Sequence, residues 1–255
     1  MIDAIRSEWA KTWTTRSTWF TLAAIVALGV LFALLFGHAA AAEHARMTAA
    51  ERAAYRPAPD FRPLIFIQIA VGYFGLRAFT VEHLTRTMTL TLTTTPRRGR
   101  VLAAKAVVCG GLTLACGTVT GLIVVFVNRA VLTSRSVPVN PLAEPGMLRV
   151  LAGPGLLLAL LGLIGLAVGC LVRSTAGAMV ITIVTGVFVP AMASLYPEWL
   201  ARLILGYWPI TAGLRLLSLD GDPDLPGPAA GIAVTCAWAA ILLAAAYVVF
   251  RRRDA

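Results

Sequence analysis

The sequence predicts an all-α membrane protein, and three observations lead to this fold class. Of its 255 residues, 58% are hydrophobic and only 13% are charged, whereas an ordinary globular domain has about 25% charged residues. The chain also contains six long apolar stretches, each of about 18 to 24 residues, which is enough for a helix to cross a hydrocarbon core. Because a bilayer tolerates no unpaired backbone groups, stretches of this kind are expected to be helical.

The six expected spans are separated by connections that contain arginine, proline or acidic residues. They cover residues 19–42, 64–81, 106–127, 150–172, 177–195 and 229–250. Residues 19–255 are therefore expected to form one six-span transmembrane domain, with short loops and no separate catalytic domain.

Residues 1–18 predict an amphipathic helix that lies in the membrane interface. Ile2, Ile5, Trp9 and Trp13 fall within one narrow arc of such a helix, as in helices that bury one face among the headgroups. The alternative is an ordered flank whose tryptophans belong to the aromatic belt. Charged residues occur throughout the segment, which argues against a cleavable signal sequence.

The distribution of basic residues indicates an orientation. In the six-span arrangement, 13 arginines and lysines lie on the side of the two termini and 9 lie on the other side. The positive-inside rule then places both termini in the cytoplasm. The net charge of +10 is explained by anionic lipid headgroups at that face, so no nucleic-acid partner is expected.

Small residues recur at spacings typical of close helix packing. The sets are Gly29, Ala33 and Gly37 in the first span, Gly117 and Gly121 in the third, and Gly165 and Gly169 in the fourth. Each set predicts either packing within one bundle or a dimer seam. The four cysteines all fall inside expected spans and are interpreted as packing residues, with a disulfide between spans as the alternative.

Sequence signals for chemistry within the chain are missing. The two lysines, Lys11 and Lys105, each follow an alanine, so neither belongs to a phosphate-binding loop. Metal-binding and catalytic motifs are also missing, so no metal site or enzyme activity is expected. The spans contain no deep carboxylate of the kind that carries protons in coupled transporters. Any energy source is therefore expected to come from a partner.

The connection between the second and third spans gives two conflicting local signals. Residues 87–93 alternate between polar and apolar with a period of two, which favours a strand. Leu84, Met88 and Leu92 are instead spaced as one face of a helix. A lone strand would lack a partner in so short a connection, so we expect a short amphipathic helix that ends before Pro96.

At this connection the chain resembles a known family. The residues are Glu82, Arg86-Thr87, Leu92, Thr95-Pro96-Arg97-Arg98 and Lys105, preceded by an amphipathic helix and two spans. This order resembles the membrane subunit of an ABC type-2 exporter, of the six-span kind common in actinobacteria. Two later segments, 196–200 and 208–214, resemble the short re-entrant outer helices of that family. His83 departs from the pattern, because an aromatic residue is expected there.

The resemblance implies that the connection is a coupling helix which docks on an ATPase subunit. Its coupling residues would be Glu82, Leu84, Arg86, Met88, Leu92, Arg97 and Arg98, with the leucines and the methionine as the apolar contacts. The local alternative for Glu82 is an ion pair with Arg86.

The resemblance also implies partners and a location. Two ATPase subunits would bind ATP and Mg, while this chain would bind no cofactor and would pair with a second membrane subunit, identical or different, in the bacterial plasma membrane. The exported substrate would be amphipathic and drug-like or lipid-like. Candidates for lining its path are Gln68, Tyr73, Phe188 and Met192, with plain packing as the alternative. An ATP-independent channel or carrier and a membrane scaffold or immunity protein are the other function classes.

Overall fold

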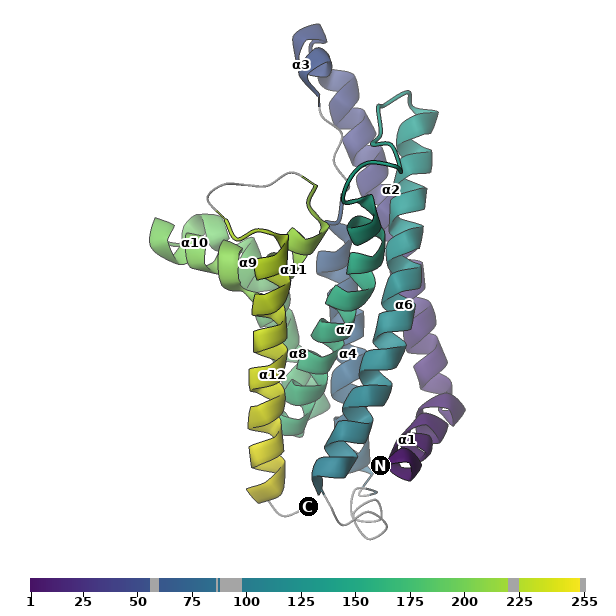
Figure 1. Cartoon of the computed structure of the whole chain (residues 1–255), viewed down its shortest axis with the longest axis vertical. Coiled ribbons are helices and arrows are strands. Elements are labelled where there is room, and N and C mark those ends of the chain that lie inside the picture. The colour runs from purple at the N-terminus through teal and green to yellow at the C-terminus, as the bar shows by residue number, and fades with distance from the viewer. Residues whose placement is uncertain (56–59, 86, 88–97, 220–224, 253–255) are drawn as a thin grey trace.

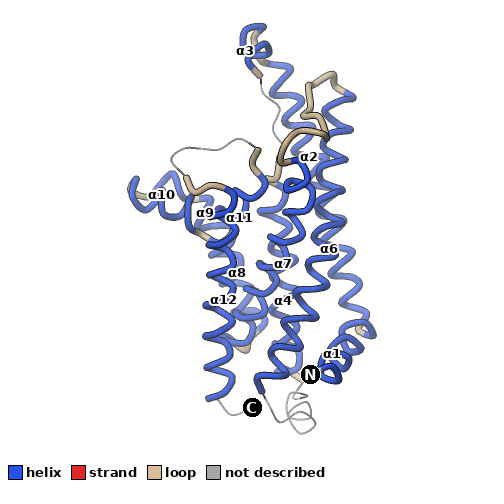
Figure 2. The backbone as a smooth tube through the Cα atoms, in the orientation of Figure 1, coloured by secondary structure: helices blue, strands red, loops and turns tan. Residues whose placement is uncertain are grey.

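The computed structural model describes residues 1–55, 60–85, 87, 98–219 and 225–252, and within them the secondary structure is helical throughout. Five long helices run side by side along the long axis of the molecule (Figures 1 and 2). They are α2 (Arg16–Arg46), α4 (Pro63–Leu84), α6 (Arg98–Ser134), α7 (Met147–Val172) and α12 (Pro228–Arg252). All five are long and apolar enough to cross a membrane, which agrees with five of the predicted spans.

The remaining apolar stretch, predicted as 177–195, is a shorter helix that covers Thr175–Ala191. It begins as α8 (Thr175–Ile183), widens into the π-helix η1 (Val184–Phe188) and ends as α9 (Val189–Ala191). The 3₁₀ turn η2 (Ala193–Leu195) follows. Its π-helical turn distinguishes it from the five long helices.

The helices extend beyond the apolar stretches from which they were predicted. α6 begins at Arg98 instead of residue 106, and α4 continues to Leu84 instead of residue 81. Backbone hydrogen bonding continues past the last apolar residue, whereas the apolar pattern stops at the first charge. As a result, Glu82 and Lys105 lie inside rigid helices and not in the connection between them.

The N-terminal helix α1 covers Ile2–Thr14, so it is shorter than the predicted 1–18. Thr15 is extended, with φ −85° and ψ 113°, and separates α1 from α2. Trp9 and Trp13 remain exposed while Glu8 is buried against the bundle. Of the predicted apolar arc, Ile2, Trp9 and Trp13 face away from the protein, as in an interfacial helix, whereas Ile5 packs against the bundle.

The core of the bundle lies around α7, which contacts α4, α6 and α12. A Cβ atom added at Gly165 would lie 2.5 Å from the carbonyl oxygen of Gly72 on α4, so only glycine allows this approach. Gly121 is similarly close to Pro154 of α7. These contacts place the small residues within one bundle, as the packing alternative predicts. All four cysteines are free thiols.

Short helices gather at the end of the bundle opposite to α1 (Figure 1). α3 (Ala49–Ala54) begins with a capping box formed by Thr48 and Glu51. α10 (Glu198–Tyr207) and α11 (Pro209–Leu214) are followed by the 3₁₀ turn η3 (Arg215–Leu217). α10 and α11 start where the sequence predicts the short outer helices.

Candidate functional site

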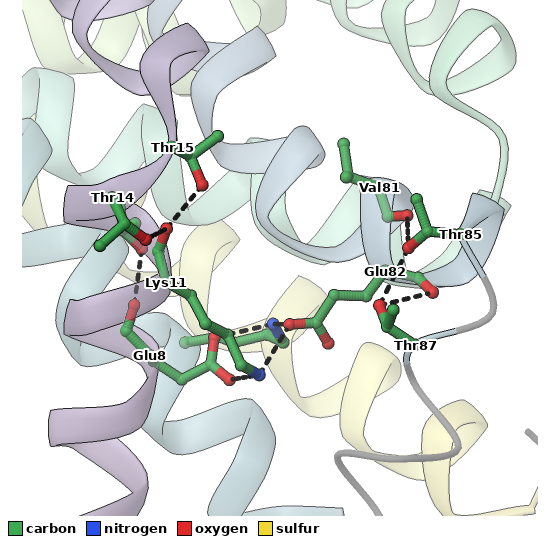
Figure 3. A network of polar contacts seen from close by, with 10 residues as sticks. Glu8, Lys11, Thr14, Thr15, Val81, Glu82, Thr85 and Thr87 are labelled. Atoms are coloured by element: carbon green, nitrogen blue, oxygen red, sulfur yellow. Dashed lines mark hydrogen bonds and ion pairs between the residues drawn. The ribbon is translucent and has the colours of Figure 1, made fainter.

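Four charged residues from three helices converge at the end of the bundle where α1 lies (Figure 3). Glu8 and Lys11 are one turn apart on α1, Glu82 is in the last turn of α4, and Lys105 is near the start of α6. We refer to these four residues as the ion-pair ring. It joins α1 to the two helices that flank residues 85–97.

The ring is closed, because each lysine contacts both glutamates. Lys11 Nζ lies 2.8 Å from Glu8 Oε1 and 3.0 Å from Glu82 Oε1. Lys105 Nζ lies 2.8 Å from Glu8 Oε2 and 2.8 Å from Glu82 Oε1. Two positive and two negative charges alternate, so the net charge of the ring is zero.

Burial makes this compensation necessary. The side chain of Lys105 is 2% exposed and that of Glu8 is 9% exposed, so both charges have lost most of their hydration. An uncompensated buried charge costs several kcal/mol, about 3 to 5 when one partner of a buried pair is removed. The four residues are therefore expected to act as one unit, in which the loss of any member exposes the others to that cost.

Lysine suits this arrangement better than arginine. A compact ammonium has three donors that can point in different directions, whereas a guanidinium presents a planar fork. The chain has 22 basic residues, and its only two lysines are both in the ring. This unusual use of lysine was the one signal in the sequence that could have identified the ring.

The pKa of Lys11 is raised above its ordinary value. Burial alone would lower this pKa, but the hydrogen bonds and charges of Glu8 and Glu82 together outweigh it. Lys11 therefore stays protonated at neutral pH and keeps the ring closed.

Further contacts fix the helix ends around the ring. The guanidinium of Arg77 on α4 donates a hydrogen bond to the hydroxyl of Ser17 at the start of α2. Arg98 Nη1 donates to the carbonyl oxygen of Phe250 at 3.0 Å and so joins the start of α6 to the end of α12. The ends of α2, α4, α6 and α12 are thus held together beside α1.

The predicted coupling residues fall into two groups. Glu82, Leu84 and Arg98 are in the structure: Glu82 belongs to the ring, Leu84 is 66% exposed and Arg98 contacts α12. The others, and with them most of the predicted coupling helix, lie outside the described residues. They are Arg86, Met88, Leu92 and Arg97.

The predicted path residues also differ in their exposure. Gln68 is buried, and its Nε2 donates to the carbonyl oxygen of Gly186 at 2.7 Å, so it fastens α4 to η1. Tyr73 is half-buried. Phe188 is 56% exposed and Met192 is 40% exposed, so both lie on the surface of the single chain. The contact made by Gln68 is a packing contact, and the role of the four residues in lining a path stays a prediction.

Gln68 occupies a position where the helix lacks its own donor. The carbonyl of Gly186 would normally accept from the N–H of residue 190, but Pro190 has none. In the π-helical turn, the N–H of Val189 donates to the carbonyl oxygen of Val184, five residues earlier. It therefore does not donate to the carbonyl oxygen of Thr185, which would be its partner in an α-helix. The indole Nε1 of Trp208 donates to the carbonyl oxygen of Thr185 at 2.6 Å. Two side chains thus replace two missing backbone donors.

Comparison with protein families gives a match to the model of the ABC-2 family transporter proteins over residues 4–189. The match covers α1 from its third residue, all four members of the ion-pair ring and the chain through η1. A search of curated proteins gave no match to this chain.

Proposed function

The chain belongs to the ABC-2 family of transporter proteins, and we propose that it is the membrane-spanning permease subunit of an ATP-driven exporter. Membership of this family implies a lipid bilayer and a separate ATPase partner. In the proposed exporter, two ATPase subunits bind ATP and Mg, and a second membrane subunit completes the path for an amphipathic, drug-like or lipid-like substrate.

The proposed topology has six crossings, with Thr175–Ala191 as the fifth. This stretch is apolar but short, and the exposed α10 that follows it carries Trp199 and Leu203 on its outer face. Such a helix suits an interface in which tryptophan is favoured. Both termini and the ion-pair ring are then cytoplasmic, in keeping with the excess of basic residues on that side.

The single observation that carries the coupling proposal is the position of the ion-pair ring. Glu82 lies two residues before α4 ends and Lys105 lies near the start of α6, so the ring holds both ends of the segment 85–97. A force on that segment would be transmitted to the ends of α4 and α6 and to α1 together. Separating these helices would leave buried charges without a partner. This is the property required of an element that converts ATPase closure into helix movement.

In the proposed cycle, the segment docks in a groove of the ATPase through its apolar side chains. ATP binding brings the two ATPases together and moves the docked segments inward. The ring passes this movement to α4, α6 and α1, and the path opens outward. Phe188 and Met192, which are exposed on the single chain, would face the second membrane subunit or the substrate in this arrangement.

The test is a substitution in the segment itself. Met88→Asp places a charge on the proposed apolar face, which would have to be desolvated without a partner at a cost of several kcal/mol, about 3 to 5. We expect Met88→Asp to reduce copurification of the ATPase, or to uncouple ATP hydrolysis from transport. Thr94→Asp adds the same charge off that face and is expected to be much milder.

The position of the two substituted residues makes this test selective. Neither residue belongs to the ion-pair ring, whereas Glu82→Arg would break the ring and confuse docking with stability. If Met88→Asp leaves both the complex and transport intact, the segment 84–92 is not the coupling element. Nucleotide binding by the isolated chain at micromolar affinity would contradict the division of labour between permease and ATPase.

A further inference from the structure

A cavity of about 330 Å³ lies next to the ion-pair ring, between α1, α4 and the start of α6. Its volume is at the lower end of the range of small-molecule pockets, about 300 to 1,000 Å³. The wall combines the four ring residues with Arg77, several threonines and apolar side chains such as Phe74 and Val108. It is therefore partly polar and charged and partly apolar.

The charges on this wall do not cancel. The ring contributes two lysines and two glutamates and is neutral, whereas Arg77 adds a positive charge. Within the described parts of the chain, no carboxylate lies within ion-pair distance of Arg77, and its hydrogen-bond partner Ser17 is neutral. A half-buried guanidinium without a counter-charge favours an anion, and its donor geometry matches phosphate.

The position of the cavity indicates which kind of molecule would supply that anion. α1 covers one side of it and presents Ile2, Trp9 and Trp13 outward, as expected of a helix in the membrane interface. The cavity thus lies at the depth of the lipid headgroups, and its apolar wall formed by Phe74, Val81 and Val108 can accompany the start of an acyl chain. Basic pockets between membrane helices at this depth suit anionic headgroups.

We propose that this cavity is a binding site for the phosphate headgroup of an anionic phospholipid, with Arg77 as its principal ligand. Lys11 and Lys105 remain paired within the ring and do not bind the headgroup directly. A bound headgroup would bridge α1 and α4 and so stabilise the end of the bundle. The site requires neither the ATPase nor a transport cycle.

The test uses the full-length chain in an uncharged detergent and follows its thermal unfolding midpoint during titration with three additives. These are short-chain phosphatidylglycerol, short-chain phosphatidylcholine and inorganic phosphate. A ligand that binds only the folded chain raises the midpoint. We expect phosphatidylglycerol to raise it more than either of the other additives.

Three variants locate the effect. Arg77→Gln removes the proposed ligand and is expected to require about tenfold more phosphatidylglycerol for the same shift, as the loss of one charge-assisted hydrogen bond predicts. Ala78→Leu keeps every charge but fills part of the cavity, and is expected to lose the shift. Arg6→Gln removes an exposed charge of α1 that does not line the cavity, and is expected to behave as the unaltered chain does.

Three outcomes would overturn the proposal. An equal shift in the unaltered chain, Arg77→Gln and Ala78→Leu would show that the lipid binds elsewhere. An equal shift with phosphatidylcholine would contradict selection by charge, and an equal shift with inorganic phosphate would assign the cavity to a free anion. If Arg77→Gln does not fold, Ala78→Leu decides, because it leaves the charges unchanged.

Discussion

The ion-pair ring and the π-helical turn η1 both contain polar groups that the regular helices do not satisfy, but they satisfy those groups differently. The ring uses four full charges, each of which contacts two opposite charges. η1 uses two neutral side chains, Gln68 and Trp208, to replace backbone donors that the helix lacks. The ring can lose no member without stranding a buried charge, whereas either neutral donor can be lost at moderate cost.

This difference suggests different mechanical roles. An element held by mutually dependent charges should move as one piece, which suits the transmission of force from a docked partner. A turn held by single hydrogen bonds can rearrange one bond at a time, and π-helical turns are common at functional positions in helices. We therefore expect the α1 end of the bundle to be rigid and the helix Thr175–Ala191 to be adaptable.

The largest expected effect concerns the side of the membrane on which the ring lies, because the result is all or none. Single cysteines at Arg52, Asp222 and Arg100, in a background without the four native cysteines, are to be treated with a membrane-impermeant thiol reagent in intact cells. We expect labelling at Arg52 and Asp222 and none at Arg100. Labelling of the Arg100 site would place the ring outside and remove its proposed role in coupling.

The next largest effect is expected from opening the ring. Lys105→Met leaves the carboxylates of Glu8 and Glu82 buried with one ammonium, at a cost of about 3 to 5 kcal/mol in the free energy of unfolding. The thermal unfolding midpoint of the purified chain is the measurement. Arg100→Met, a nearby exposed position on α6, is the matched control and should change stability little.

Reversing the ring tests whether charge pairing itself is responsible. Glu8→Lys and Glu82→Lys combined with Lys11→Glu and Lys105→Glu keep the net charge at zero and keep opposite charges adjacent at all four contacts. We expect this fourfold variant to be more stable than the variant with Glu8→Lys and Glu82→Lys alone, in which four ammonium groups would lie together. If the two are equally unstable, the shapes of the side chains matter more than their charges.

A moderate effect is expected at η1. Gln68→Leu removes the donor to the part-buried Gly186 carbonyl, and because a fully buried unsatisfied acceptor costs about 1 to 3 kcal/mol, the cost here is expected at the lower end of that range. Pro190→Ala supplies a backbone N–H that could satisfy the same carbonyl. Gln68→Leu should therefore destabilise the chain less in the Pro190→Ala background than in the unaltered chain. Equal destabilisation in both backgrounds would contradict the interpretation that the Gln68 side chain supplies the hydrogen-bond donor that Pro190 lacks.

The same two regions show what the sequence could and could not predict. Length and apolarity identify the long helices, because both are local properties of the chain. The ring joins residues 8, 11, 82 and 105, which only the packing of α1 and of α4 against α6 brings together. The π-helical turn depends on donors from Gln68 and Trp208, which lie far from it in the sequence. Pro190 was no clear local sign of this turn, because Pro154 lies inside the long helix α7.

The smallest effect is expected from titration of Lys11. Its pKa is raised in the folded chain, so its contribution to stability is complete below the unfolded pKa of about 10.4 and is lost as the pH rises through the higher folded pKa. The side chain is 40% exposed, so solvent screening limits this contribution to less than about 1 kcal/mol.

The measurement compares the unfolding midpoints of the unaltered chain and Lys11→Arg from neutral pH to above pH 11. Three groups surround Lys11: Glu8 on its own helix, Glu82 on α4, and Lys105 on α6, which also contacts both glutamates. An arginine stays charged throughout this range, so the difference between the two curves isolates the contribution of Lys11. We expect the two midpoints to differ by a constant amount up to about pH 10 and the unaltered chain to lose stability faster above it. Parallel curves over the whole range would mean that the charge of Lys11 does not contribute to holding α1 against the bundle, and that Lys105 alone connects the two glutamates.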